Sequence, residues 1–266
     1  MAAHRWELDV GTAKIISVHS YRGGTGKSNI TANLAACAVA MGHKVAVIDT
    51  DLKSPGIHVL FGVDPSQIQL TLVDYLWDKC TSTETAYDVT TRVCPNHDHA
   101  HAKCWLVPAS LDTHAISRLL DEGYDIQRLN THIDDLISQL ELDYLLIDTH
   151  PGLNDESMLT TALSDILILL VRPDQQDYYG SAVVSRIATQ LEVPNIFVVA
   201  NKLHSQIDVE QLTQHLKQAF GHDVLGAIPL SEDLAKLGSR QLIVNESPEG
   251  IVAHTLKIIA KRIFAT

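Results

Sequence analysis

Five short aliphatic runs, separated by longer amphipathic stretches, constrain the fold of this 266-residue chain more than any other feature. The runs are KIISVH (14–19), KVAVID (44–49), YLLIDT (144–149), ILILLV (166–171) and NIFVVA (195–200). Each is apolar along most of its length, which is typical of strands buried on both faces of a sheet. Because strands and helices alternate along the whole chain, the sequence predicts an α/β fold with a mostly parallel sheet covered by helices on both faces.

The stretches between these runs carry helix signals. A helix is predicted to begin at Lys27, to continue to Met41 and to end before Gly42, a residue type that commonly terminates helices. Between residues 126 and 140, apolar side chains recur at spacings of three and four. CWLVPAS (104–110) reads as a further strand. Since no repeat or low-complexity linker divides the chain, we expect residues 1–266 to form a single domain.

Charge and composition exclude several classes of protein. The formal net charge of −12 argues against sequence-independent DNA binding, which depends on neutralisation of phosphates by Lys and Arg. The sequence has no run of 18 or more apolar residues, so no membrane span is predicted. The opening residues MAAHRWELDV do not look like a signal peptide. Four cysteines in a chain of this length suit a reducing compartment, so we expect a cytoplasmic protein.

The segment SYRGGTGKSN (20–29) lies between a predicted strand and a predicted helix, which is the context of a phosphate-binding loop. Its glycines let backbone N–H groups point at phosphate oxygens, and the helix that follows presents its positive N-terminus to the same anion. The usual pattern has glycine where this chain has Tyr21. We expect Lys27 to bridge phosphates and Ser28 to hold Mg²⁺. The residues predicted to contact nucleotide here are Gly23, Gly24, Thr25, Gly26, Lys27, Ser28 and Asn29.

Carboxylates follow two other predicted strands. Asp49 and Asp51 lie in VIDTDLKSPG, and Asp148 ends the strand of LLIDTHPG. Ligands of open parallel sheets bind at the carboxyl ends of strands, so these acids are candidates for holding metal and polarising water. We predict Ser28, Asp49 and Asp148 as the Mg²⁺ site, with Gly152 in a switch segment whose N–H reaches a γ-phosphate.

The segment VVANKLH (198–204) helps to select the base. A GTPase is expected to have aspartate two residues after the Asn-Lys pair, whereas this chain has His204. We expect Asn201 to hydrogen-bond adenine, and ATP to be preferred over GTP.

Together these segments resemble the MinD/ParA family of deviant-Walker ATPases over essentially the whole chain. The family motif K-G-G-x-G-K-[ST] accepts a non-glycine residue at the position of Tyr21, and its signature lysine corresponds to Arg22. The segment IPLSED (228–233), which contains Pro229, corresponds to a base-contacting loop of the family. By resemblance, ATP closes a face-to-face homodimer in which Asp51 positions the attacking water and Arg22 acts on the partner's nucleotide. The expected catalytic residues are Lys27, Asp51 and Arg22.

Arginine at position 22 is a departure from the family motif. It keeps the positive charge and can bind phosphate through two hydrogen bonds, but it is planar and bulkier than lysine. The resemblance therefore implies an ATP-hydrolysing dimerisation switch that positions or regulates another cellular component through a protein partner. Slow hydrolysis, or a nucleotide-binding adaptor with little turnover, is the alternative.

The segment CPNHDHAHAKC (94–104) is unusual, and we take it as a loop insertion. Its side chains Cys94, His97, His99, His101 and Cys104 suggest Zn²⁺ binding, although the spacing matches no zinc signature. A metal-delivery NTPase is therefore a second alternative, and a polar surface loop is the plain one. The last segment, residues 251–266, is amphipathic and basic. We expect it to be the final helix of the domain rather than a membrane anchor.

Overall fold

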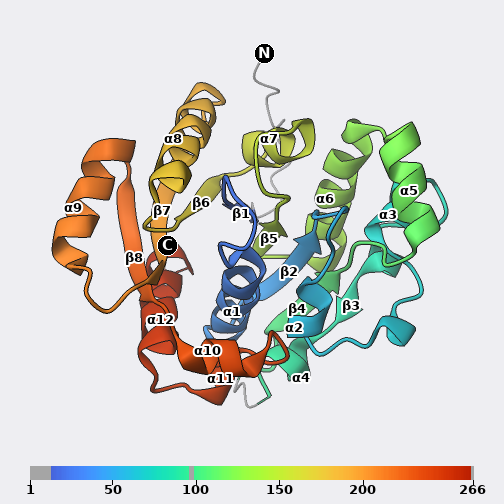
Figure 1. The fold of residues 1–266 in the computed structure, drawn as a ribbon. Coiled ribbons are helices and arrows are strands. Elements are labelled where there is room, and N and C mark those ends of the chain that lie inside the picture. Colours follow the sequence, from blue (N-terminus) through green and yellow to red (C-terminus); the bar gives the residue numbers. More distant parts are fainter. Residues whose placement is uncertain (1–12, 96–98, 265–266) are drawn as a thin grey trace.

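The computed structural model describes residues 13–95 and 99–264. An eight-stranded sheet runs through them in the order β3-β4-β2-β5-β1-β6-β7-β8 (Figure 1). All neighbouring strands are parallel except β3 and β4, which pair antiparallel. The strands are β1 (Lys14–His19), β2 (Lys44–Asp49), β3 (Tyr87–Asp88), β4 (Lys103–Val107), β5 (Tyr144–Asp148), β6 (Ile166–Val171), β7 (Asn195–Leu203) and β8 (Asp223–Pro229). The predicted fold class is confirmed.

Helices occupy most of the connections between strands. The α-helices are α1 (Lys27–Ala40), α2 (Ile57–Leu60), α3 (Leu72–Leu76), α4 (Thr90–Val93), α5 (Thr113–Glu122), α6 (Ile126–Leu140), α7 (Asp155–Ala162), α8 (Gln175–Gln190), α9 (Val209–Phe220), α10 (Glu232–Leu237), α11 (Ile243–Glu246) and α12 (Ile251–Phe264). Two 3₁₀ turns are η1 (Pro65–Gln67) and η2 (Thr83–Thr85). In the described part of the chain, none of these helices has both the length and the apolar character that crossing a bilayer requires.

The sheet is buried on both faces, as its apolar strands require. Ile16 and Val47 join side chains of α1 and α12 in one apolar cluster. Their neighbours Ile15 and Ile48 point to the opposite face, where they pack with α3 and α6. The alternation follows from the two-residue period of a strand. Each central strand therefore contributes to two cores at once, and Figure 1 shows the helices layered on either side.

Strand order determines where the polar loops meet. β1 lies between β5 and β6, and β2 lies on the other side of β5. Asp49 of β2 is paired in register with Asp148 of β5, and Asp148 is in turn paired with Val18 of β1. The loops that leave β1, β2 and β5 therefore emerge side by side at one edge, which is where ligands bind in open α/β sheets.

Candidate functional site

The loop after β1 is shaped for an anion. α1 begins at Lys27, and the preceding Gly26 has φ 101° and provides no side-chain cap. The first N–H groups of the helix therefore keep their capacity to bind a ligand. A Cβ atom at Gly26 would lie 2.6 Å from Asn201 Nδ2. Both the left-handed backbone and this close approach require glycine.

Two side chains of β7 hold the loop from behind. Asn201 Nδ2 donates to the carbonyl oxygen of Thr25 at 2.7 Å, and Lys202 Nζ donates to that of Gly24 at 2.7 Å. Because both contacts use carbonyl groups, they order the loop without occupying its N–H groups. Asn201 Oδ1 accepts from the Lys202 N–H at 2.9 Å, and the residue is buried. The structure thus places Asn201 against the phosphate loop, and its contact with adenine stays a prediction.

Asp148 is one of the buried acids of the site. The Ser28 hydroxyl hydrogen-bonds to its carboxylate, and burial raises the pKa of Asp148 to about 6, against the smaller opposing effects of Ser28 and the Lys27 charge. Asp148 Oδ1 is buried and has no hydrogen-bond partner among the described residues. An orphaned carboxylate oxygen beside a hydroxyl and a lysine fits a magnesium ion bound with phosphates. Ser28 and Asp148 would hold that ion.

Asp49 lies beside Asp148, but its oxygens serve the protein. Oδ1 accepts from the Asp51 N–H at 3.0 Å, and Oδ2 accepts from the Gly56 N–H at 3.3 Å. Burial, and then the Asp148 charge, raise the pKa of Asp49 well above its usual range. Asp49 therefore shapes the loop after β2, and its predicted role as a metal ligand stays a prediction.

Asp51 contacts a residue that the sequence interpretation did not select. His150 Nδ1 lies 2.6 Å from Asp51 Oδ1, and the two side chains are 21% and 16% exposed. The position of His150 within DTHPG, two residues after Asp148, was the available signal. The contact joins the loop after β2 to the loop after β5.

The predicted switch residue Gly152 has φ 89°, and its N–H donates to the carbonyl oxygen of Ser20 at 3.0 Å. It thus lies against the phosphate loop. Pro229 ends β8 and is partly exposed, and Asn29 lies in the first turn of α1. The roles of these residues in nucleotide binding stay predictions.

Arg22 and Tyr21 contact the start of α8, which the sequence interpretation did not connect with the site. Arg22 Nη1 lies 3.1 Å from Gln176 Oε1 and 3.5 Å from Asp174 Oδ2. The Arg22 side chain is 41% exposed, so it remains within reach of a partner. The Tyr21 ring covers Gly180, where a Cβ atom would lie 1.9 Å from Tyr21 Cδ1. Only glycine admits the ring there.

The predicted Cys/His-rich loop of residues 94–104 needs correction at its end. Cys104 belongs to β4 and is fully buried in the apolar cluster under α1. Burial raises the pKa of its thiol, so it is a poor metal ligand. His97 lies outside the described residues. Within the described ranges no group of three or more His, Cys, Asp or Glu side chains is placed to hold a metal, so the zinc prediction gains no support there.

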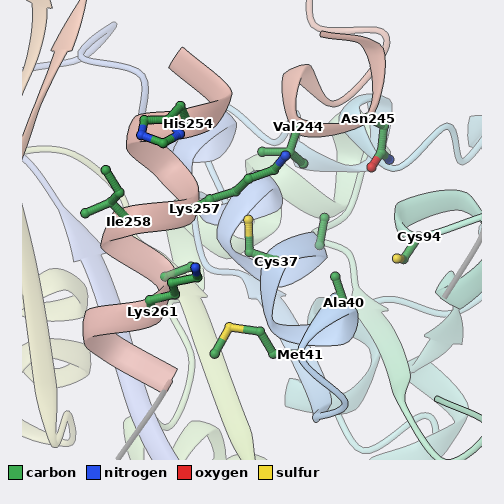
Figure 2. A pocket seen from close by; sticks show the side chains of 12 residues that line it. Cys37, Ala40, Met41, Cys94, Val244, Asn245, His254, Lys257, Ile258 and Lys261 are labelled. Atoms are coloured by element: carbon green, nitrogen blue, oxygen red, sulfur yellow. The ribbon is translucent and has the colours of Figure 1, made fainter. Parts of the chain in front are cut away.

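A groove of about 260 Å³ lies elsewhere, between α1, α11 and α12 (Figure 2). Cys37 lines it from the C-terminal part of α1 and Met41 from the residue directly after that helix, while Lys257 and Ile258 line it from α12. Cys37 is ten residues beyond Lys27, or about 15 Å along the helix. The groove is therefore separate from the phosphate loop.

Comparison with known proteins finds relatives and structures of similar fold. The iron–sulfur cluster carrier protein of Methanococcus maripaludis is 32% identical over 197 residues, which are 70% of this chain and 59% of that protein. The flagellum site-determining protein of Helicobacter pylori is 22% identical over 258 residues, 94% of this chain and 81% of that protein. In three dimensions the chain resembles the septum site-determining protein MinD of Pyrococcus horikoshii, solved with Mg-ADP. That match has a TM-score of 0.77 at 22% identity and covers 95% of this chain and 96% of that one.

The family model described as the CobQ/CobB/MinD/ParA nucleotide-binding domain matches residues 16–244. This range includes the phosphate loop, both acidic loops and Asn201. Because the match spans most of the sequence, the chain belongs to the CobQ/CobB/MinD/ParA nucleotide-binding family.

Proposed function

We propose that this protein binds ATP with Mg²⁺ and hydrolyses it slowly, and that ATP closes a homodimer that positions or regulates another cellular component. The proposal rests mainly on Asp148 Oδ1, which is buried without a hydrogen-bond partner in a carboxylate that bonds to Ser28. The phosphate loop next to it leads into α1, whose N-terminus has no side-chain cap. A buried carboxylate oxygen without a hydrogen-bond partner is costly unless a cation completes the site.

Each residue near the phosphates has a distinct role in this proposal. Lys27 and the N–H groups of the loop bind the β- and γ-phosphates, and Ser28 with Asp148 holds the metal, which supplies positive charge to the transferring phosphoryl group. Asp51 orients the attacking water. Asn201 and Lys202 keep the loop in its phosphate-binding shape through their contacts with Thr25 and Gly24.

The dimer is supported by what lies exposed around the site. Arg22 is partly exposed beside the phosphate loop. Large apolar side chains are exposed on the segments that follow β5 and β8 and on α8: Leu153, Tyr179 and Leu230. A second copy that covered these side chains would bring its own Arg22 towards the nucleotide, where a guanidinium can stabilise phosphate charge. The name of the Helicobacter relative, a flagellum site-determining protein, supports a positioning role.

A second alternative is metal delivery, since a relative is named as an iron–sulfur cluster carrier. The described residues do not favour it. Cys37 and Cys104 are buried, and no suitable group of ligands is present in the described ranges. A nucleotide-binding adaptor with little turnover differs from our proposal only in its rate of hydrolysis.

Phosphate release from Mg²⁺–ATP by the purified protein tests the proposal. We expect turnover that is lost in Lys27→Ala and retained in the control Lys236→Ala, whose side chain is 70% exposed on α10. Tight ATP binding without phosphate release, even at high protein concentration, would favour the adaptor. Absence of ATP binding would refute both.

A further inference from the structure

We propose that His150 is a positioning residue that orients the Asp51 carboxylate towards the attacking water. This inference rests on the proposed function, because it assigns Asp51 its task in ATP hydrolysis. His150 does not touch the nucleotide in this account. It acts through the hydrogen bond between its Nδ1 and Asp51 Oδ1, which measures 2.6 Å.

The backbones on both sides of this contact are fixed. Before His150, Thr149 Oγ1 donates to the carbonyl oxygen of Val18 at 3.0 Å, and after it the Gly152 N–H donates to that of Ser20 at 3.0 Å. His150 is thus held between β1 and the phosphate loop. On the other side, the Asp51 N–H donates to Asp49 Oδ1 at 3.0 Å. The side-chain hydrogen bond connects two anchored loops.

The two oxygens of Asp51 are used unequally. Oδ1 accepts from His150 and also from the Ser54 N–H at 3.2 Å. For Oδ2, no hydrogen bond is present within residues 13–95 and 99–264. Two contacts on one oxygen fix the plane of the carboxylate and leave the other oxygen to accept a proton from water. An aspartate held by one contact alone would rotate about its terminal torsion, which is soft.

The place of His150 in the chain couples this orientation to the phosphate site. It lies between Asp148, which bonds to Ser28, and Gly152, which contacts the phosphate loop. Any movement of the segment from Asp148 to Gly152 moves the imidazole and therefore the carboxylate that it holds. Misplacement of a reacting group by about 1 Å can cost roughly 100-fold in rate. His150 would then orient the Asp51 carboxylate for the attacking water only when the segment from Asp148 to Gly152 is correctly placed.

The hydrogen bond requires a particular form of the imidazole. An ionised carboxylate only accepts hydrogen bonds, so the proton must lie on Nδ1. Asparagine places an amide nitrogen at the same number of bonds from Cα as Nδ1. His150→Asn therefore keeps a donor near Asp51, whereas His150→Leu keeps bulk without a donor.

The test compares steady-state kinetics of these two variants with the wild type. We expect His150→Leu to lower kcat by roughly 10- to 100-fold while its affinity for ATP changes by less than about threefold. His150→Asn should recover most of kcat. Equal kcat in His150→Leu and wild type would overturn the inference, as would a raised kcat, which would mean that the contact restrains Asp51. Loss of ATP binding in His150→Leu would point to a structural role instead and would also overturn it.

A second readout does not depend on turnover. In nucleotide-free protein, ¹⁵N NMR of the imidazoles should show His150 with its proton on Nδ1 in the wild type, and Asp51→Ala should abolish this preference. A wild-type imidazole with a proton on Nε2 and none on Nδ1 would overturn the inference. Wild-type protein that fails to hydrolyse ATP would count against the proposed function, whereas the NMR result would still decide whether His150 holds Asp51.

Discussion

Asp148 should make the folded protein less stable at neutral pH, and Asp148→Asn should reverse this. Burial raises the pKa of Asp148 from 3.8 to about 6. Each pKa unit corresponds to about 1.36 kcal/mol, so a shift of about two units makes the ionised carboxylate cost up to about 3 kcal/mol in the folded state. Asparagine has similar size and no charge to desolvate. The variant should therefore have a higher free energy of unfolding at pH 8 and should lose Mg²⁺-dependent ATP binding.

The pH dependence has a definite sign. Because the pKa of Asp148 is higher in the folded than in the unfolded chain, the folded protein binds more protons between about pH 4 and 6. The contribution of Asp148 to the free energy of unfolding therefore rises as pH falls through this window. The advantage of Asp148→Asn should thus be greatest at pH 8 and shrink towards pH 5. Urea denaturation at several pH values, with EDTA present, measures it. The exposed control Asp121→Asn should change nothing. A variant less stable than wild type at pH 8, or a difference independent of pH, would refute the reasoning.

Three further substitutions test other parts of the account. Gly26→Ala should weaken ATP binding and destabilise the fold by about 1–3 kcal/mol, because φ at this residue is 101° and the added methyl group would clash with Asn201. Unchanged affinity for ATP, measured by titration, would count against phosphate binding by this loop. Gly180→Ala should cost about 1–3 kcal/mol in the wild type, measured by urea denaturation. The loss of unfolding free energy caused by Gly180→Ala should be much smaller in a protein that also carries Tyr21→Ala. Equal losses with and without Tyr21→Ala would show that the ring is not the obstacle. Cys104→Ser should lower the free energy of unfolding by about 1–3 kcal/mol through burial of a hydroxyl, equally with and without EDTA, whereas a loss seen only without chelator would indicate a bound metal.

The strongest signals in the sequence were the five short, mostly apolar runs. All five runs form strands, as expected of short, mostly apolar and β-branched runs that are buried on both faces of a sheet. β8 was not predicted, since its sequence DVLGAIP mixes Asp and Gly with few β-branched residues, and its pairing with β7 supplies the missing preference. β3 has only two residues, too few for a recognisable sequence pattern, and it is defined by its antiparallel pairing with β4.

The candidate site was predictable where one loop defines it and not where two loops meet. The glycine pattern and Lys27 identify the phosphate loop because local backbone geometry requires those residue types. The contact of His150 with Asp51 joins residues 99 positions apart, and Arg22 meets Asp174 across 152 positions. Such pairings follow from strand order and loop shape, which no local pattern encodes.

Cys104 shows the opposite error, in which a local pattern suggested too much. Its place in a Cys/His-rich segment indicated a metal ligand, but its register opposite Val45 turns the thiol into the core. Two-residue alternation within β4, rather than proximity to histidines, decides which way it points.

Solution molar mass of the Asp51→Ala protein, measured by light scattering with Mg²⁺–ATP and again with Mg²⁺–ADP, shows whether ATP controls dimerisation. Removal of the water-orienting carboxylate should slow hydrolysis and leave ATP bound. We expect a dimer with ATP and a monomer with ADP. The same mass with both nucleotides would contradict an ATP-dependent dimerisation switch.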